Sequence, residues 1–326
     1  MLRRYIKQKL SDNQRVAVEK LVRRVWWLLD MLLFPYQLIV TIYVKRKCPV
    51  NTLSPMQTIE AIKEGTSVSR FGDGELNLLL HKRGIVFQEW DEELSNQLRE
   101  ILTMNTNSLT SENGGFMVGI PFIITTYRGY RYSVRFLLYW VKYNFYNLRN
   151  IQLLLRSRIY LDALFARSLN MRDRVKIYEA ICDIWSGKHL VIIEGETVKF
   201  GVNKSILSNA KSIARIICPV KNAYSEYDEI LEAAIKCDKD SLILIILGPT
   251  ATILAYDLYK LGYRAVDFGQ GNFSKDIKET GNILTELDYH QQIIARIGVT
   301  DNALLISNSR ISNHNTRSLQ NEAYSR

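Results

Sequence analysis

The sequence has few of the residues that build disulfide frameworks or zinc sites. Its four cysteines are far apart and form no Cys-x-x-Cys pair, and its four histidines are equally dispersed. Structural zinc sites and disulfide frameworks need such side chains at recognisable spacings. We therefore expect a reduced protein of the cytosol. Any metal would have to be held by carboxylates, whose oxygens favour Mg²⁺ or Mn²⁺.

Positive charge is scarce outside the first fifty residues. The chain carries a net charge of +10, and residues 1–50 hold 11 basic and three acidic residues, which leaves about +2 for the other 276 residues. A nucleic-acid-binding domain carries its basic charge across the fold, so we expect no nucleic-acid partner. The aromatic and basic stretch 127–149 keeps that alternative open, although such a stretch is more often an amphipathic helix.

Residues 25–44 form a 20-residue apolar run, long enough to cross a bilayer. Asp30, Pro35 and Gln37 interrupt it, and the basic residues before it would keep the N-terminus cytosolic and export the rest of the chain. No small-residue cleavage site follows, as a signal peptide would require. We therefore expect residues 1–50 to form a helical arm on the anionic inner face of the cell membrane, with the protein cytoplasmic and peripherally attached. The alternative is a pair of core helices.

Beyond the arm, short apolar runs alternate with helical patterns. This alternation predicts a Rossmann-like, doubly wound α/β fold with a mostly parallel sheet over residues 51–300, followed by a polar, flexible tail at 301–326. The expected strands are 67–71, 116–120, 189–195, 214–219, 241–248 and 264–269, and the expected helices are 54–64, 75–82, 91–104, 171–186, 205–213, 225–238 and 250–262.

The stretch VSRFGDGELN (68–77) places two carboxylates around a glycine directly after an expected strand. Asp73 as a helix cap and Glu75 in the first turn would explain them without a ligand. They are also a candidate pair of oxygen ligands for a divalent cation. Because residues i and i+2 diverge by about 200° around a helix, the pair converges only while the backbone is extended or turning.

Polar side chains stand at three further strand ends. Glu194 and Glu196 follow one strand, Thr250 and Thr252 lie in the first turn of the helix after another, and Asp267 ends a third. Ligands of doubly wound sheets gather beyond the carboxyl ends of the strands, so these groups are expected to share one site. Taken singly, each is also typical of a capped turn between a strand and a helix.

Several motifs in one order make the chain resemble the bacterial glycosyltransferases of the GT-D fold, first catalogued as a domain of unknown function. The resemblance covers residues 52–275. The motifs are SVSRFGDGEL (67–76), VGIPF (118–122), RSRIYLD (156–162), VIIEGE (191–196), AKSIARIICPVKNAYSEYDEIL (210–231) and LGPTATILAYDLYKLGYRAVDFG (247–269).

The resemblance implies a metal-dependent glycosyltransferase that takes a nucleotide sugar, typically a UDP-sugar, as donor. The family's Asp-x-Glu motif falls on Asp73 and Glu75, which would hold Mn²⁺ or Mg²⁺. The catalytic candidates are Arg70, Glu194, Glu196 and Asp267, and the donor-binding candidates are Gly72, Arg158, Tyr160, Lys199, Gly248, Pro249, Thr250 and Thr252. The arm suggests a saccharide or lipid-linked saccharide acceptor, as in the synthesis of capsule or other surface polysaccharides.

The chain departs from the family pattern at two places. Lys199 replaces an arginine and residues 203–205 replace Gly-Asn-Asp, while Gln270 stands where relatives have histidine. The carboxylate motif is intact, so altered substrate choice is the main expectation. The alternative is a catalytically impaired, nucleotide-binding scaffold of a polysaccharide assembly complex.

Overall fold

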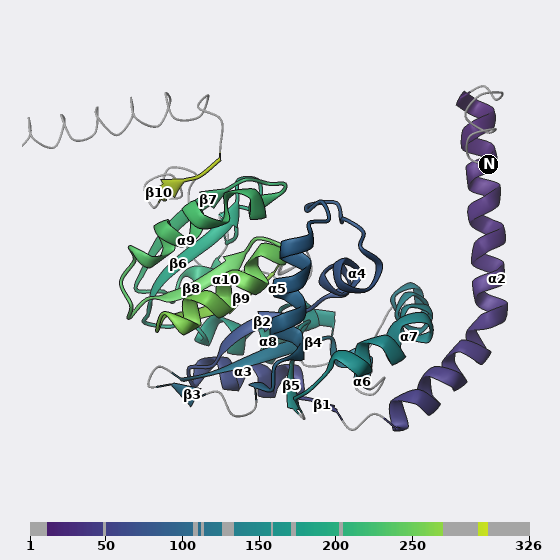
Figure 1. Cartoon of the computed structure of the whole chain (residues 1–326), viewed down its shortest axis with the longest axis horizontal. Coiled ribbons are helices and arrows are strands. Elements are labelled where there is room, and N and C mark those ends of the chain that lie inside the picture. The colour runs from purple at the N-terminus through teal and green to yellow at the C-terminus, as the bar shows by residue number, and fades with distance from the viewer. Residues whose placement is uncertain are drawn as a thin grey trace, which may run out of the picture. The chain divides into compact units, whose positions relative to one another are not determined.

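The computed structural model describes residues 12–47, 50–106, 110–111, 114–125, 134–157, 159–170, 174–201, 205–269 and 293–298 (Figure 1). The expected tail 301–326 lies outside these residues. The chain divides into two compact units: an α/β unit, Asn51–Phe122 with Arg156–Arg326, and a helical unit, Met1–Val50 with Ile123–Leu155. The expected boundary after residue 50 coincides with a unit boundary. Residues 123–155, expected within the second domain, group instead with the arm.

The α/β unit is built on one sheet whose strands run in the order β1-β5-β4-β2-β9-β8-β6-β7-β10, and these neighbours are parallel. Strand β3 pairs antiparallel with β4. The strands are β1 (Asn51–Thr52), β2 (Ser67–Arg70), β3 (Thr110–Ser111), β4 (Gly114–Ile120), β5 (Ile159–Asp162), β6 (His189–Gly195), β7 (Ser212–Cys218), β8 (Leu242–Ile246), β9 (Arg264–Asp267) and β10 (Ile293–Arg296). Because β4 and β9 flank β2, the chain order reverses at the centre of the sheet, where doubly wound folds bind ligands.

Apolar side chains cover both faces of the central strands, so the sheet has a core on each side. Ile192 belongs to the cluster that includes helix α8, whereas its neighbour Ile193 belongs to the cluster that includes helix α10. Successive side chains of a strand point to opposite faces, which explains the near-continuous apolar runs of these strands. Figure 1 shows the helices on both faces of the sheet.

Local signals explain where several helices begin. Ser54 and Gln57 form a reciprocal cap on α3, with Pro55 in its first turn. Asp91 Oδ1 accepts a hydrogen bond from the Leu94 N–H at 2.8 Å at the start of α5. The α-helices of the unit are α3 (Pro55–Lys63), α4 (Asp73–His81), α5 (Glu92–Thr103), α8 (Arg174–Asp183), α9 (Tyr227–Ile235) and α10 (Pro249–Lys260), with α6 (Phe122–Thr125) at its boundary.

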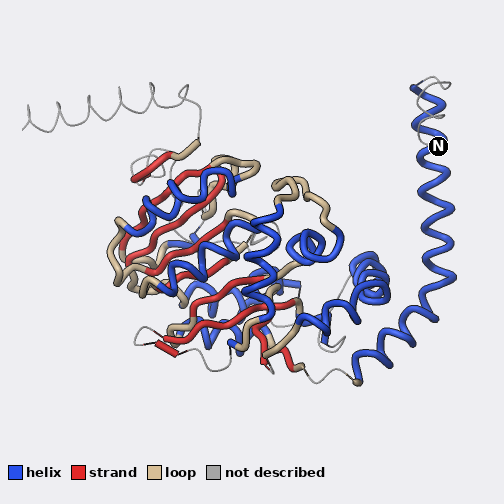
Figure 2. The backbone as a smooth tube through the Cα atoms, in the orientation of Figure 1, coloured by secondary structure: helices blue, strands red, loops and turns tan. Residues whose placement is uncertain are grey.

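The structure confirms the Rossmann-like, mostly parallel fold and all six expected strands (Figure 2). The expected helix at 205–213 is wrong. Only a short 3₁₀ turn, Ser205–Leu207, lies there, and β7 begins at Ser212. The apolar residues of segment 205–213 belong to the core beside the sheet, so their spacing does not indicate a helix. Strands β1, β3, β5 and β10 were not expected, because two to four residues are too few for a periodic pattern.

The helical unit consists mainly of α2 (Asp12–Arg46) and α7 (Val134–Leu154), which pack against each other. Lys142 Nζ lies 2.6 Å from Asp30 Oδ1, and the rings of Tyr36 and Phe145 meet edge to face with centroids 5.7 Å apart. These contacts explain why residues 123–155 belong with the arm. Helix α2 continues through Pro35 and is long and apolar enough, by length and composition, to cross a membrane.

Candidate active site

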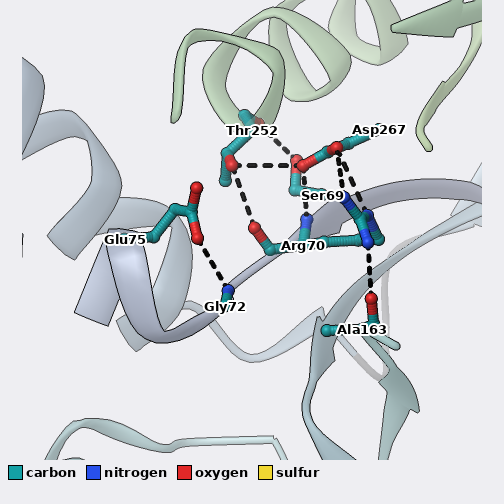
Figure 3. Close-up of polar contacts among 7 residues, drawn as sticks. All are labelled: Ser69, Arg70, Gly72, Glu75, Ala163, Thr252 and Asp267. Carbon is teal, nitrogen blue, oxygen red and sulfur yellow. Dashed lines mark hydrogen bonds and ion pairs between the residues drawn. The ribbon is translucent and has the colours of Figure 1, made fainter. Parts of the chain in front are cut away.

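Two charged residues at the ends of neighbouring strands form the centre of the site (Figure 3). Arg70 ends β2 and Asp267 ends β9. The Arg70 guanidinium donates to Asp267 Oδ1 through Nη2 at 3.1 Å and Nε at 3.3 Å, and the Arg70 backbone N–H donates to Oδ2 at 3.2 Å. Their side chains are 12% and 4% exposed, so the pair lies at the carboxyl edge of the sheet with Arg70 just reaching solvent.

Helix α10 closes one side of this pair. The Thr252 hydroxyl donates to the Arg70 carbonyl at 2.9 Å and lies 3.2 Å from Asp267 Oδ2. In turn the Ser69 hydroxyl donates to the Thr252 carbonyl. Thr252 is fully buried, so it joins the helix to the two strand ends rather than facing a ligand directly.

One glycine makes room for the Arg70 side chain. Gly269 has a left-handed backbone (φ +58°), and a Cβ there would collide with the guanidinium. A Cβ at Gly119 of β4 would make only ordinary van der Waals contact with Arg70 Cγ, at 3.5 Å. Arg70 Nη1 donates to the Ala163 carbonyl at 2.5 Å, so the guanidinium is held from β9 and from the loop after β5.

The expected metal ligands lie beside this pair, in the first turn of α4. The Gly72 N–H donates to Glu75 Oε2 at 2.8 Å, so the Glu75 side chain folds back over the beginning of its own helix (Figure 3). Glu75 remains partly exposed, yet desolvation of its carboxyl group, with the negative charge of Asp267, raises its pKa to about 7. Burial also raises the pKa of Asp267, against the opposing effect of Arg70.

Whether Asp73 and Glu75 can bind a cation depends on the direction of their side chains at the start of α4. Helix α4 already begins at Asp73, so Asp73 and Glu75 leave the helix in diverging directions and do not converge as an extended backbone would allow. The backward fold of Glu75 nevertheless brings its carboxylate to the end of α4 where Asp73 lies. Among the described residues no group of three or more His, Cys, Asp or Glu side chains could hold a metal. Two carboxylates fit Mg²⁺ or Mn²⁺ when water and substrate oxygens complete the coordination.

Arg167 is a residue of this site that the sequence motifs did not reveal. It lies in the 3₁₀ turn Phe165–Asn170 after β5 and is exposed. Desolvation and the charge of Arg70 lower its pKa, whereas Asp73, Glu75 and Asp267 oppose that shift. Arg167 is therefore a second positive charge within electrostatic range of the three carboxylates. It follows the RSRIYLD motif by five residues, and an isolated arginine in a loop carries no signal of its own.

The beginning of α10 offers a second polar group to the same edge. Gly248 has φ +58°, and nothing lies within 4 Å of the position that a Cβ would take. Pro249 follows in the first turn, and the fully buried Thr250 hydroxyl has no hydrogen-bond partner within the protein. Unpaired N–H groups at a helix start bind phosphate oxygens, whereas the buried Thr250 hydroxyl, like that of Thr252, does not face a ligand directly.

The expected catalytic role of Glu194 needs correction. Its side chain is fully buried, Oε1 accepts from Arg215 Nη1 at 2.6 Å, and Oε2 accepts from the Phe200 N–H at 2.7 Å. Arg215 Nη2 donates to the Phe200 carbonyl at 2.9 Å. Both carboxylate oxygens are therefore occupied inside the core, and the pair anchors the loop after β6. The sequence does contain a sign of this buried pair, because Arg215 is a charged residue within the apolar strand β7.

The remaining expected residues are only partly brought to the site. Tyr160 is fully buried, and its hydroxyl accepts from the N–H groups of Arg156 and Ser157, so it supports the β5 region instead of facing a donor. Glu196 is partly exposed and Lys199 is exposed with φ +46°, both on the loop after β6. Arg158, residues 203–204 and Gln270 lie outside the described residues.

Comparisons with known proteins agree with this architecture. Residues 68–277 match the family described as glycosyltransferase GT-D fold. The chain is 36% identical over 225 residues to "Probable glycosyl transferase Gly" of Streptococcus gordonii, covering 68% of this chain and 32% of that protein. It is 28% identical over 265 residues to "Glycosyltransferase GlyD" of Streptococcus pneumoniae, covering 72% of this chain and 31% of that protein. The chain thus spans about a third of the length of these curated relatives.

Two solved structures are similar to this chain over nearly their whole length. A structure described as a new glycosyltransferase of domain of unknown function 1792, from Streptococcus sanguinis, shares 32% identity and a TM-score of 0.66, covering 76% of this chain and all of that one. Another, described as showing that this domain has a distinct glycosyltransferase fold, gives a TM-score of 0.68 at 28% identity, covering 78% and 98%. The chain belongs to the GT-D fold family of glycosyltransferases, which defines its enzyme class.

Proposed function

We propose that the protein transfers a sugar from a nucleotide-sugar donor, with a UDP-sugar as the first candidate, to a saccharide or lipid-linked saccharide. The observation that carries this proposal is the group of Arg70, Asp267, Glu75 and Arg167 at the carboxyl edge of the sheet. Departure of a nucleoside diphosphate develops negative charge on its phosphate oxygens, and fixed cations at a largely desolvated site stabilise that charge.

Each element of the site has a place in this proposal. Arg70 is oriented by Asp267 and points its partly exposed guanidinium to the strand ends, and Arg167 adds a second positive charge. The start of α10, with the open space at Gly248, offers backbone N–H groups to phosphate or ribose oxygens.

Asp73 and Glu75 are the residues proposed to hold Mg²⁺ or Mn²⁺. A bound cation would neutralise charge on the diphosphate and relieve the repulsion between Glu75 and Asp267 that raises the pKa of Glu75. Among the carboxylates first expected to accept the acceptor's proton, Glu196 remains the candidate, because it is partly exposed whereas Glu194 and Asp267 are buried and paired.

The test is diphosphate release from a panel of nucleotide sugars, with and without Mn²⁺, followed for the full chain. We expect metal-dependent release, and we expect Asp73→Asn to lower it by about 100-fold. Asp240→Asn is the matched control, because Asp240 is exposed and precedes β8 at the opposite edge of the sheet.

Two outcomes would separate the alternatives. Unchanged metal-dependent turnover in Asp73→Asn would remove this residue from the site. Nucleotide binding without release from any donor would favour the catalytically impaired scaffold instead.

The membrane remains the proposed place of action. The apolar arm with its flanking basic residues supports a protein held at the cytosolic face of the cell membrane, where lipid-linked acceptors of surface polysaccharide synthesis are found. Sedimentation with anionic vesicles tests this part independently of turnover.

A further inference from the structure

Helix α2 of the helical unit has its polar and apolar residues in reversed positions. On α2, Gln37, Thr41 and Lys45 are buried, and their spacing of four residues places them on one face of the helix. In a protein whose helices face water, the buried stripe of a helix is apolar and the exposed side is polar. On α2 the polar residues are buried instead, on the side of the helix that faces the rest of the helical unit.

Several buried polar groups of the helical unit form hydrogen bonds within it. Lys45 Nζ and Asn144 Nδ2 both donate to the Ile123 carbonyl, the latter at 3.1 Å. The Thr41 hydroxyl donates to the Gln37 carbonyl at 2.6 Å. Buried polar groups need such bonds most where no water can replace them.

Exposed apolar side chains lie on both helices. On α7, Tyr139, Tyr146 and Leu153 are exposed at seven-residue spacing, which places them on one face, and the exposed polar residues Arg149 and Asn150 lie on the same face near the end of the helix. On α2 the exposed apolar side chains do not form a single stripe: Trp26, Trp27, Leu28 and Leu29 are four consecutive residues, and together they surround the helix. Only 11% of the apolar window of α2 is buried, which counts against the expected alternative of a core helix.

Asp30, the charge that interrupts the apolar run, has a partner in α7. Its carboxylate lies 2.6 Å from Lys142 Nζ, with side chains 30% and 41% exposed. An acidic residue within an apolar helix is costly in lipid when alone, and pairing with a cation on a neighbouring helix reduces that cost. The main objection to burying this part of α2 in lipid is therefore weakened by the structure.

We infer that α2 and α7 together form a membrane-inserted unit, whose outward apolar side chains contact the acyl chains of an anionic bilayer. This inference rests on the proposed action at a membrane and extends it from residues 1–50 to α7. Two observations favour lipid over a second copy of the chain. A partner helix would cover one stripe, whereas the exposed residues surround α2, and the net charge of +8 in residues 1–50 complements anionic lipid.

The experiment is flotation of the full chain, purified in detergent, with vesicles of phosphatidylcholine alone or mixed with phosphatidylglycerol. We expect binding that is stronger with the anionic lipid, and quenching of tryptophan fluorescence by brominated acyl chains. Leu32→Ser combined with Ile39→Ser should weaken partition by about tenfold or more, because both side chains are exposed on α2. Val86→Ser is the matched control, since Val86 is 78% exposed on the α/β unit and Leu32 is 77% exposed.

The contribution of α7 is tested separately. Tyr146→Ser with Leu153→Ser should also weaken vesicle binding, although α2 is unchanged. If this variant binds as well as the wild type while the α2 variant does not, α7 is not part of the surface and the inference is overturned. It is also overturned if the α2 variant binds vesicles normally, or if it changes only the oligomeric state measured by light scattering.

Diphosphate release, measured in detergent on the same preparations, separates this inference from the proposed function. Turnover without vesicle binding would overturn membrane insertion and leave sugar transfer standing. Vesicle binding without turnover from any donor would support insertion and count against transfer. Circular dichroism of each variant confirms that the helices are retained.

Discussion

The α/β unit contains two arginine–carboxylate pairs that differ in exposure and therefore in role. Arg215 and Glu194 have no solvent exposure, and their bonds to Phe200 anchor the loop after β6. Arg70 and Asp267 lie at the carboxyl edge of the sheet, and Arg70 still reaches solvent. The same kind of ion pair thus supports the fold in one place and is proposed to present a cation to a ligand in the other.

Breaking the deeper pair should have the largest effect on stability. In Arg215→Met, the Glu194 carboxylate stays buried without its cation, and we expect unfolding to become easier by about 3–5 kcal/mol in urea titrations. Diphosphate release per folded molecule should change little. The double variant Arg215→Met with Glu194→Leu should recover much of the lost stability, because no unpaired charge remains. A double variant as unstable as the single one would show that packing, not charge, dominates.

Stability should also depend on pH through Glu75. Its pKa of about 7 exceeds its ordinary 4.5, so the folded state favours the protonated form. The contribution is fully present below about pH 4.5 and is lost as pH rises through 7, with a total of about 3 kcal/mol or less. Unfolding in EDTA between pH 5 and 8 should show this decline. Glu75→Gln should flatten it, and an equal slope in that variant would contradict the assignment.

Removing the carboxylate of the edge pair should affect activity more than stability. For Asp267→Asn we expect a stability loss of about 2 kcal/mol, because Arg70 keeps its bond to Ala163 and some contact with solvent. Diphosphate release should fall by about 100-fold, since the guanidinium loses its orientation. A variant that loses stability but keeps its turnover would place this pair with Arg215–Glu194 as purely structural.

The exposed ion pair on α9 should have the smallest effect on stability. Glu232 and Lys236 on α9 lie 2.7 Å apart with side chains 65% and 69% exposed. Glu232→Gln should leave the free energy of unfolding almost unchanged in urea titrations, and any difference should vanish in high salt. A loss comparable to that of Asp267→Asn would show that exposure alone does not rank these pairs.

The fold could be predicted from the sequence largely because its strands are apolar on both faces, as Leu190–Ile193 and Leu242–Ile246 illustrate. The residues of the site were found by their place at strand ends, as with Arg70 and Asp267. Their roles were not, because burial and pairing depend on residues far apart in the chain. Nothing near Glu194 in the sequence shows that Arg215 on the neighbouring strand occupies its carboxylate.

The helical unit was predictable only in part. The apolar run of α2 is visible in the sequence, but the face that it turns toward the protein depends on α7, which lies about a hundred residues later. The alternation of aromatic and basic residues around Lys142 gave no sign that this lysine pairs with Asp30. Contacts between distant segments carry no local pattern.

The glycine after β9 has a consequence for surveys of uncharacterised relatives. The Arg70 guanidinium occupies the space that any side chain at position 269 would need, so the arginine and this glycine can persist only together. A homologue that keeps the arginine yet carries a bulkier residue at that position must hold its cation elsewhere. Such a substitution would mark relatives in which the strand ends present their positive charge from a different residue.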